Sequence, residues 1–141
     1  MTESFFQQCV QKHFDWLIED DNFRVVARHK FGCFDNEEVV FESPRCRISV
    51  GLERSDVYVG VAPLSSVEEI WFYLGGVIKY LTQGADHSCD FDIPRSVEYE
   101  TRIEQKVARF AEILHKYRSR VYEVVSPETF HSRRADLMKW V

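Results

Sequence analysis

Polar and apolar residues alternate without interruption in two neighbouring stretches of the sequence, residues 45–53 and 56–61. A period of two is typical of a β-strand that buries one of its faces. Residues 23–31 and 38–42 show the same period. Because short connections rich in turn-forming residues separate the four stretches, only antiparallel neighbours are possible. We therefore predict a four-stranded antiparallel meander over residues 23–61 with one apolar face.

Apolar residues that recur at every third or fourth position predict helices on both sides of this sheet. The first helix covers residues 2–19, with Thr2 or Ser4 as its N-cap. A second helix begins at a capping box within residues 65–69 and ends near Gly84. Its apolar and aromatic residues surround the whole circumference, so this helix either lies in the core or covers a partner.

A third, longer helix is predicted from residue 95 or 96 to Val124. Its apolar residues are spaced alternately by four and three, which produces a seam longer than one small sheet can cover. We expect the far end of this seam to be buried either by a homodimer or by a last helix that starts at Ser126 and Pro127 and folds back. The seam consists of Ile103, Val107, Phe110, Leu114, Tyr117, Val121 and Val124.

Together these elements predict one α+β domain that spans residues 1–141. One helix precedes the sheet, three helices follow it, and the helices cover one face of the sheet. A chain of this length can bury a full hydrophobic core without disulfide or metal staples.

The composition excludes several classes of protein. The net charge of −5 argues against general binding to nucleic acid, which needs clustered excess lysine and arginine. No run of 18 residues is apolar, so we expect no membrane span. The first residues are acidic and lack the apolar segment of a signal peptide. The four cysteines have no paired spacing, which favours reduced thiols in the cytoplasm.

Sequence motifs for nucleotide binding, zinc proteolysis or a serine nucleophile do not occur in the chain. We therefore expect no cofactor, and the lack of these motifs favours a non-enzymatic function. Because enzymes without a recognisable motif exist, catalysis stays an alternative.

One predicted loop, Asp86 to Asp92, contains three aspartates together with His87 and Cys89. A metal ion could use such ligands. Their order matches neither a calcium loop nor a zinc site, and neighbouring carboxylates would raise the pKa of the Cys89 thiol. We expect a solvated acidic loop without a metal. The alternative is a small-molecule binder, a metal binder or an enzyme that uses this loop.

The alternation also gives the predicted sheet an outward face. Basic side chains would gather on it, beside the small residues Ser49, Gly51 and Gly60. They either form a basic surface or pair across the strands with neighbouring glutamates. The basic residues are Arg24, Arg28, Lys30, Arg45 and Arg47.

Acidic residues gather near the end of the first predicted helix and in the first predicted hairpin. Negative charge of this kind steers a basic protein partner during encounter. We therefore expect a non-enzymatic protein-binding module with a partner-binding surface at these positions. They are Asp15, Glu19, Asp20, Asp21, Asp35, Glu37 and Glu38.

The order of elements is helix, four-stranded meander, helix, long helix and terminal helix, and it includes the segment from Val39-Val40-Phe41-Glu42-Ser43 to Val50. Over the whole chain this order and size resemble small α+β proteins of bacteria, many of them uncharacterised and some of them immunity proteins that neutralise toxins. The resemblance implies a toxin-neutralising role, with a basic toxin domain as the partner. It carries no functional residues across to this chain.

Overall fold

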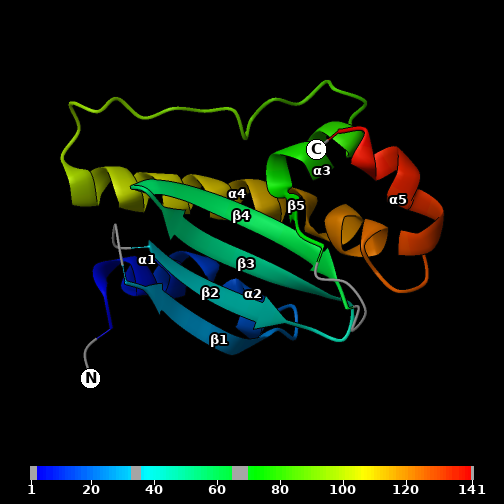
Figure 1. Cartoon of the computed structure of the whole chain (residues 1–141), viewed down its shortest axis with the longest axis horizontal. Helices are drawn as coiled ribbons and strands as arrows, with labels where there is room; N and C mark the ends of the chain where they lie inside the picture. The colour runs from blue at the N-terminus through cyan, green and yellow to red at the C-terminus, as the bar shows by residue number, and fades with distance from the viewer. Residues whose placement is uncertain (1–2, 33–35, 65–69, 141) are drawn as a thin grey trace.

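A computed structural model of the chain describes residues 3–32, 36–64 and 70–140. The strands form one antiparallel sheet in the order β1-β2-β3-β4-β5, and the helices lie on one side of it (Figure 1). The predicted α+β class is confirmed, with a short fifth strand added to the predicted four. The elements are α1 (Phe5–Phe14), α2 (Trp16–Glu19), β1 (Arg24–Phe31), β2 (Asn36–Glu42), β3 (Cys46–Glu53), β4 (Asp56–Pro63), β5 (Phe72–Tyr73), α3 (Leu74–Leu81), α4 (Tyr99–Val124) and α5 (Phe130–Met138).

The first predicted helix is divided into α1 and α2 at Asp15, which is the C-cap of α1. Of the two predicted N-caps, Ser4 performs this role: its hydroxyl oxygen accepts a hydrogen bond from the backbone N–H of Gln7 at 3.1 Å. Thr2 lies outside the described residues.

A β-bulge changes which residues of β1 face the helices. Val25 pairs with Phe41, but Ala27 pairs with Val40, so one extra residue is inserted between them. Directly paired residues of antiparallel strands point to the same face, so every side chain after the bulge lies on the face opposite to the predicted one. Phe31, expected on the apolar face, is therefore 53% exposed.

The same bulge removes Arg28 and Lys30 from the predicted basic surface, whereas Arg24 stays on the same face as Arg47 through its pairing with Glu42. Arg28 pairs with Val39, whose side chain is buried on the helix side, and it lines a small hollow with residues of α1. Arg47 instead lies on the open face, the face of the sheet that carries no helix. The two basic residues are therefore on opposite faces.

Residues 70–73 do not belong to a helix, contrary to the prediction. Phe72 pairs with Val61 and Tyr73 pairs with Gly60, which makes β5 the last strand of the sheet. Consecutive aromatic residues suit a strand, because alternate rings can pack on opposite faces. Phe72 is buried and Tyr73 is 64% exposed. The predicted capping box in residues 65–69 lies outside the described residues.

The apolar seam of α4 is covered within the chain. Ile103, Val107 and Leu114 are fully buried beneath the sheet. The segment between α3 and α4 covers another side of the seam, where the Phe91 and Phe110 ring centroids are 4.9 Å apart. A helix of 26 residues extends about 39 Å, so it needs both covers.

The last helix folds back, as one of the two expected arrangements requires. Phe130 and Leu137 of α5 are buried, and the Phe130 ring lies 5.9 Å from that of Phe72. Val121 and Val124 of α4 are buried as well. The far end of the seam is thus not an exposed strip that a homodimer must bury. Within the described residues, no helix is both long enough and apolar enough to cross a membrane.

The turn between β3 and β4 has an unusual backbone. Glu53 pairs with Asp56, so the loop consists of two residues, and both have positive φ: 51° at Arg54 and 69° at Ser55. A hairpin turn of this type matches the twist of the strands, but asparagine and glycine are the residues that usually supply it. Arg54 and Ser55 therefore hold a conformation that costs about 1 kcal/mol or more per residue.

Ser55→Gly should stabilise the protein. Glycine adopts positive φ without the steric penalty, although it has more freedom to lose on folding. We expect the free energy of unfolding to rise by about 0.5 to 1 kcal/mol in a urea titration. The control is Ser119→Gly on the exposed side of α4, where glycine should cost about 0.5 kcal/mol. A loss of stability in Ser55→Gly would contradict this description of the turn.

Candidate functional site

Small residues form the middle of the open face. Ser49 pairs with Val40 and Gly60 in neighbouring strands, and Gly51 pairs with Tyr58. A Cβ atom added at Gly51 would overlap the Tyr58 ring, and one at Gly60 would lie 3.3 Å from the Trp71 ring. Aromatic rings therefore pack directly on the backbone of the sheet, which larger side chains at the glycine positions would prevent.

These rings enclose a hollow of about 250 Å³, which we call the aromatic pocket. Tyr58 and Tyr73 meet edge to face, with ring centroids 6.2 Å apart and planes at 88°. Trp71 supplies a further wall, and the guanidinium of Arg47 lies 5.3 Å from the centre of its ring. The pocket is lined by Glu38, Ser49, Glu53, Tyr58, Gly60, Trp71, Phe72 and Tyr73.

Two carboxylates give the aromatic pocket a negative charge. Glu38 accepts hydrogen bonds from the hydroxyl of Ser49 at 2.7 Å and from the phenol of Tyr58 at 3.4 Å. Burial, and then the negative charge of Glu38, raise the pKa of Tyr58 to about 12. The phenol therefore stays neutral at physiological pH. The charged groups among the lining residues are Glu38 and Glu53, and the positive guanidinium of Arg47 lies against the Trp71 wall.

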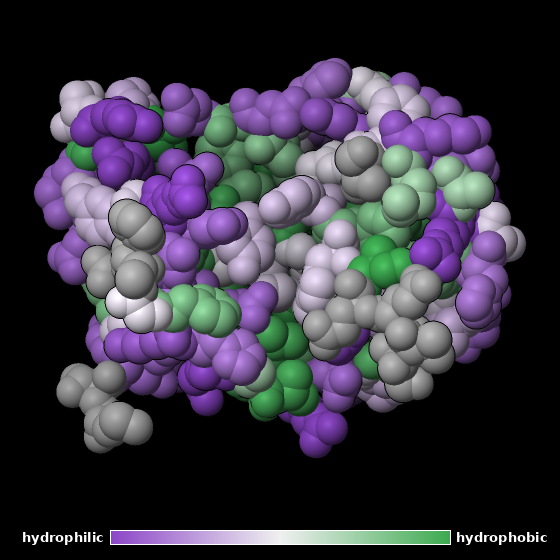
Figure 2. Space-filling model, viewed as in Figure 1, coloured by the Kyte–Doolittle hydropathy of each residue, from purple (hydrophilic) through white to green (hydrophobic). Residues whose placement is uncertain are grey.

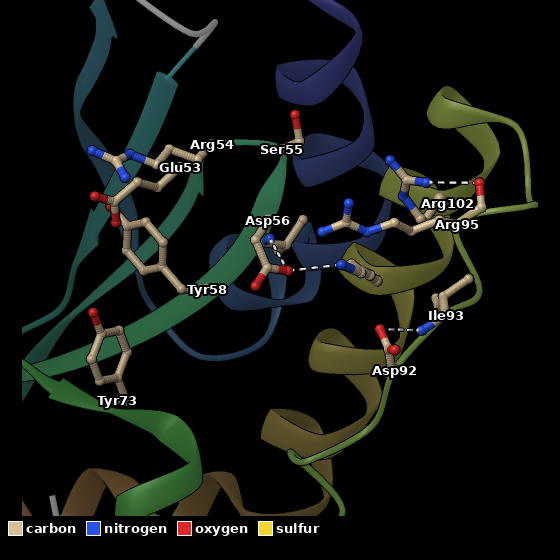
Figure 3. Close-up of a pocket in the computed structure, with 12 residues that line it drawn as sticks. Glu53, Arg54, Ser55, Asp56, Tyr58, Tyr73, Asp92, Ile93, Arg95 and Arg102 are labelled. Carbon is tan, nitrogen blue, oxygen red and sulfur yellow. Dashed lines mark hydrogen bonds and ion pairs between the residues drawn. The ribbon is translucent and has the colours of Figure 1, made fainter.

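A larger hollow of about 840 Å³, the hairpin cleft, adjoins the aromatic pocket and shares Glu53, Tyr58 and Tyr73 with it. Figure 3 shows these residues on one side of the cleft and Arg95 and Arg102 on the other. The remaining residues that line it are Arg54, Ser55, Asp56, Val57, Asp92, Ile93 and Lys106. In the space-filling view of this face, strongly hydrophilic side chains gather over the same region at the left (Figure 2).

The acidic residues predicted to bind a partner do not form one surface. Glu37 is buried on the helix side, where its carboxylate accepts a hydrogen bond from Ser4 at 2.5 Å. Glu38, its neighbour in β2, lies on the open face in the aromatic pocket. Asp21 accepts a hydrogen bond from the Tyr122 hydroxyl at 2.7 Å.

Three more of the acidic residues predicted to bind a partner, Asp15, Glu19 and Asp20, lie in or next to α2. A hydrogen bond with Asp15, and then the charge of Asp15, raise the pKa of Glu19, so these two carboxyl groups are neighbours. Asp20 is the exposed C-cap of α2. Asp35 lies outside the described residues. Glu38 alone among the described members contributes to the aromatic pocket.

The loop from Asp86 to Asp92 makes a hydrogen bond with α4 and an ion pair with α3. Asp86 accepts hydrogen bonds from the Ser88 N–H and from the hydroxyl of Tyr117. Hydrogen bonds from the Ser88 side chain, from Tyr117 and from the Ser88 backbone, in that order, lower the pKa of Asp86 to about 2. Asp90 pairs with Lys79 at 2.8 Å. Residues 3–32, 36–64 and 70–140 contain no group of three histidine, cysteine or acidic side chains that could hold a metal ion. Within the loop, His87 lies 3.4 Å from Asp90, and no third ligand-type side chain joins this pair.

Cys89 packs against the backbone of α3, because a Cβ atom added at Gly75 would lie 3.2 Å from the Cβ of Cys89. Burial raises the pKa of the Cys89 thiol to about 12, and the charges of Asp86 and Asp90 act in the same direction. The predicted direction is confirmed, with burial as the larger cause. A thiol of this kind is a poor nucleophile.

No protein-family model matches the chain, and neither a curated protein nor a solved structure is detectably similar to it. Sequence reasoning missed the aromatic walls of the candidate site, because Trp71 and Tyr73 were assigned to a helix. The available signal was the row of small residues on the outward face, which leaves room for rings from elsewhere.

Gly51→Ala should displace the Tyr58 ring from its place on the backbone of the sheet. The new methyl group occupies the place of the Tyr58 ring, which must move, and we expect a loss of about 1 to 3 kcal/mol in the free energy of unfolding. Gly32→Ala is the matched control, because nothing lies within 4 Å of a Cβ atom there. Urea titration of both variants measures the difference. Equal stability of the two variants would be inconsistent with this packing.

The raised pKa of Tyr58 predicts a loss of stability in alkaline solution. The folded protein keeps the Tyr58 proton up to about pH 12, whereas the unfolded chain loses it near pH 10. The stabilisation is therefore complete below pH 10 and disappears as the pH rises through 12. When the pH is raised from about 9.5 to about 11.5, the free energy of unfolding should fall for both proteins. The fall should be about 1 to 2 kcal/mol smaller for the Tyr58→Phe variant than for the native protein. Tyr99→Phe, at an exposed tyrosine, should follow the native protein.

Proposed function

We propose that this protein is a non-enzymatic protein-binding module that receives a basic side chain of its partner in the aromatic pocket. The observation that supports this best is the combination of the Tyr58, Trp71 and Tyr73 rings with the carboxylates of Glu38 and Glu53. None of the described residues that line the pocket is basic. Such a pocket attracts a cation and repels an anion.

The chemistry of the pocket suits a guanidinium group. A cation over an aromatic ring gains about 0.5 to 2 kcal/mol, depending on its exposure to water. A planar guanidinium can also donate hydrogen bonds to a carboxylate while it stacks on a ring. The contact between Arg47 and Trp71 is an example of such stacking within this chain.

The size of the pocket favours a single side chain over a metabolite. Pockets for small molecules usually enclose about 300 to 1,000 Å³, whereas the aromatic pocket encloses about 250 Å³. An arginine head group needs less room than a whole ligand. The rest of the partner would then lie on the open face around the pocket.

The groups in the pocket are poorly suited to catalysis. Ser49 is 1% exposed and its hydroxyl is bonded to Glu38, so it is not accessible to a substrate. Tyr58 keeps its proton because its pKa is raised to about 12. Neither histidine nor cysteine is among the described lining residues. Binding is therefore the function that this arrangement supports better.

The distribution of charge would assist the encounter with a basic partner. The chain carries a net charge of −5, and a field of this sign raises the association rate with positively charged proteins. The toxin-neutralising role expected from the sequence is one particular form of this proposal. It makes the further demand that the partner be a basic toxin domain.

Two short peptides test the proposal: acetyl-Gly-Arg-Gly-amide, and the same peptide with neutral citrulline in place of arginine. NMR titration of the Trp71 indole N–H measures both affinities. One charge interaction near a protein surface contributes about 1 kcal/mol, so the arginine peptide should bind about fivefold more tightly. Equal affinities for the two peptides would rule out the proposed cation pocket.

Variants show where the arginine peptide binds. Glu38→Gln should abolish most of the difference between arginine and citrulline, since it removes a carboxylate from the pocket. Glu112→Gln changes the same charge at an exposed site on α4 and should leave the difference intact. A similar loss in both variants would indicate that general charge attracts the peptide, with no role for the pocket.

A further inference from the structure

The aromatic pocket and the hairpin cleft form one groove with opposite charges at its two ends. They adjoin each other, because Glu53, Tyr58 and Tyr73 line both. At the pocket end the charged groups are carboxylates. At the far side of the cleft, Arg95 and Arg102 extend from the start of α4 and the segment before it (Figure 3). A ligand that fits the whole groove must therefore carry both signs of charge.

The basic residues of the cleft are not equally available. Lys106 is 12% exposed and is neutralised by Asp56 at 2.7 Å. Arg102 donates a hydrogen bond to the backbone carbonyl of Arg95 at 3.3 Å and stacks on Tyr99. These two side chains, and that of Arg54 in the turn, are already engaged within the chain.

Arg95 differs from them. Its side chain reaches across the cleft toward Ser55 and Asp56 (Figure 3). Its carbonyl accepts the bond from Arg102, whereas its guanidinium has no hydrogen-bond or ion-pair partner among residues 3–32, 36–64 and 70–140. A guanidinium has five donors in a planar fork, which matches the two oxygens of a carboxylate. Arg95 is thus the group in the cleft that can take a carboxylate from outside the chain.

The strained turn between β3 and β4 is a second, independent observation at the same cleft. Arg54 and Ser55 both have positive φ and both line the cleft. Asparagine and glycine would relieve the strain. Backbone strain that persists in a protein is concentrated at functional sites, where particular side chains are needed in particular places. The turn therefore indicates that the rim of the cleft has a role in binding.

The spacing of the two ends follows from the strand. Tyr58 in the pocket and Asp56 in the cleft are two residues apart on β4, which is about 7 Å, and Arg95 lies beyond Asp56. A segment that reaches from the pocket to Arg95 must therefore be longer than about 7 Å, which needs about three residues of extended chain.

Resting on the proposed function, we infer that the partner presents an extended segment with a basic residue and, about three positions away, a carboxylate that Arg95 binds. The basic residue enters the aromatic pocket between Tyr58, Trp71 and Tyr73. The intervening residues pass over the shared wall formed by Glu53, Tyr58 and Tyr73. Both contacts together fix the position of the segment along the groove.

Four peptides test this inference by NMR titration of the native chain. The first two are acetyl-Arg-Gly-Gly-Glu-amide and its reverse, acetyl-Glu-Gly-Gly-Arg-amide. The third replaces glutamate by neutral glutamine, and the fourth places arginine and glutamate next to each other. At least one of the first two should bind about fivefold to tenfold more tightly than the glutamine peptide, because it adds a charge-assisted bidentate bond. The adjacent pair should gain less than twofold, since it cannot span the groove.

The variant Arg95→Gln assigns the gain to the cleft. It should bind the glutamate and glutamine peptides equally, while its affinity for the glutamine peptide stays that of the native protein. Arg24→Gln is the matched control, because Arg24 is 77% exposed and lies on the outermost strand. This control should keep the full gain.

Failure of the inference can be told apart from failure of the proposed function. If the glutamine peptide binds and glutamate adds nothing in either order, the two-ended groove is wrong and the aromatic pocket stands. If the gain persists in Arg95→Gln, or is equal for the adjacent pair, the inference is also overturned. If no arginine peptide binds at all, the proposed function fails and the inference falls with it.

Discussion

The strict alternation along β3 and β4 is the constraint on which the rest of the structure depends. It places Ile48, Val50 and Val61, all fully buried, on one face of the sheet. Burial of that face stabilises the fold through the hydrophobic effect and requires the cover supplied by α1, α3 and α4. Ser49 and Gly60, which lie next to them in sequence, belong to the opposite face and have a small side chain or none. Aromatic side chains can then approach the backbone on that face. The same alternation of residues therefore produces the hydrophobic core on one face and the candidate site on the other.

The local periodicity of the sequence predicted most of the strands and helices. It could not predict features that depend on pairing between distant segments. The strands β3 and β4 and the helix α4 have repeats long enough to identify them without any other information. The bulge in β1 has no such signal, so the faces of Arg28 and Phe31 were assigned incorrectly. The helix predicted for residues 70–73 was wrong for a related reason. A short aromatic run is compatible with a helix or a strand, and pairing with β4 selects the strand.

The candidate site was harder to predict than the fold, because charge in a sequence does not reveal the face on which it lies. Glu37 and Glu38 are adjacent and chemically alike. Glu37 is buried and accepts a hydrogen bond from the hydroxyl of Ser4, whereas Glu38 lies in the aromatic pocket. The rings of the pocket come from β4 and from the residues around β5, which are distant in sequence from Glu38. Only the register of the sheet brings them together.

The bulge in β1 also bears on how the protein behaves at high concentration. β1 is the outermost strand of the sheet, and its outer edge offers backbone groups to which another chain could add a strand. An irregular edge pairs poorly, and the exposed charges of Arg24, Arg28 and Lys30 repel a second copy of the same edge. The bulge and these three charges therefore disfavour extension of the sheet through this edge. That protection is compatible with an open face kept accessible to a different protein.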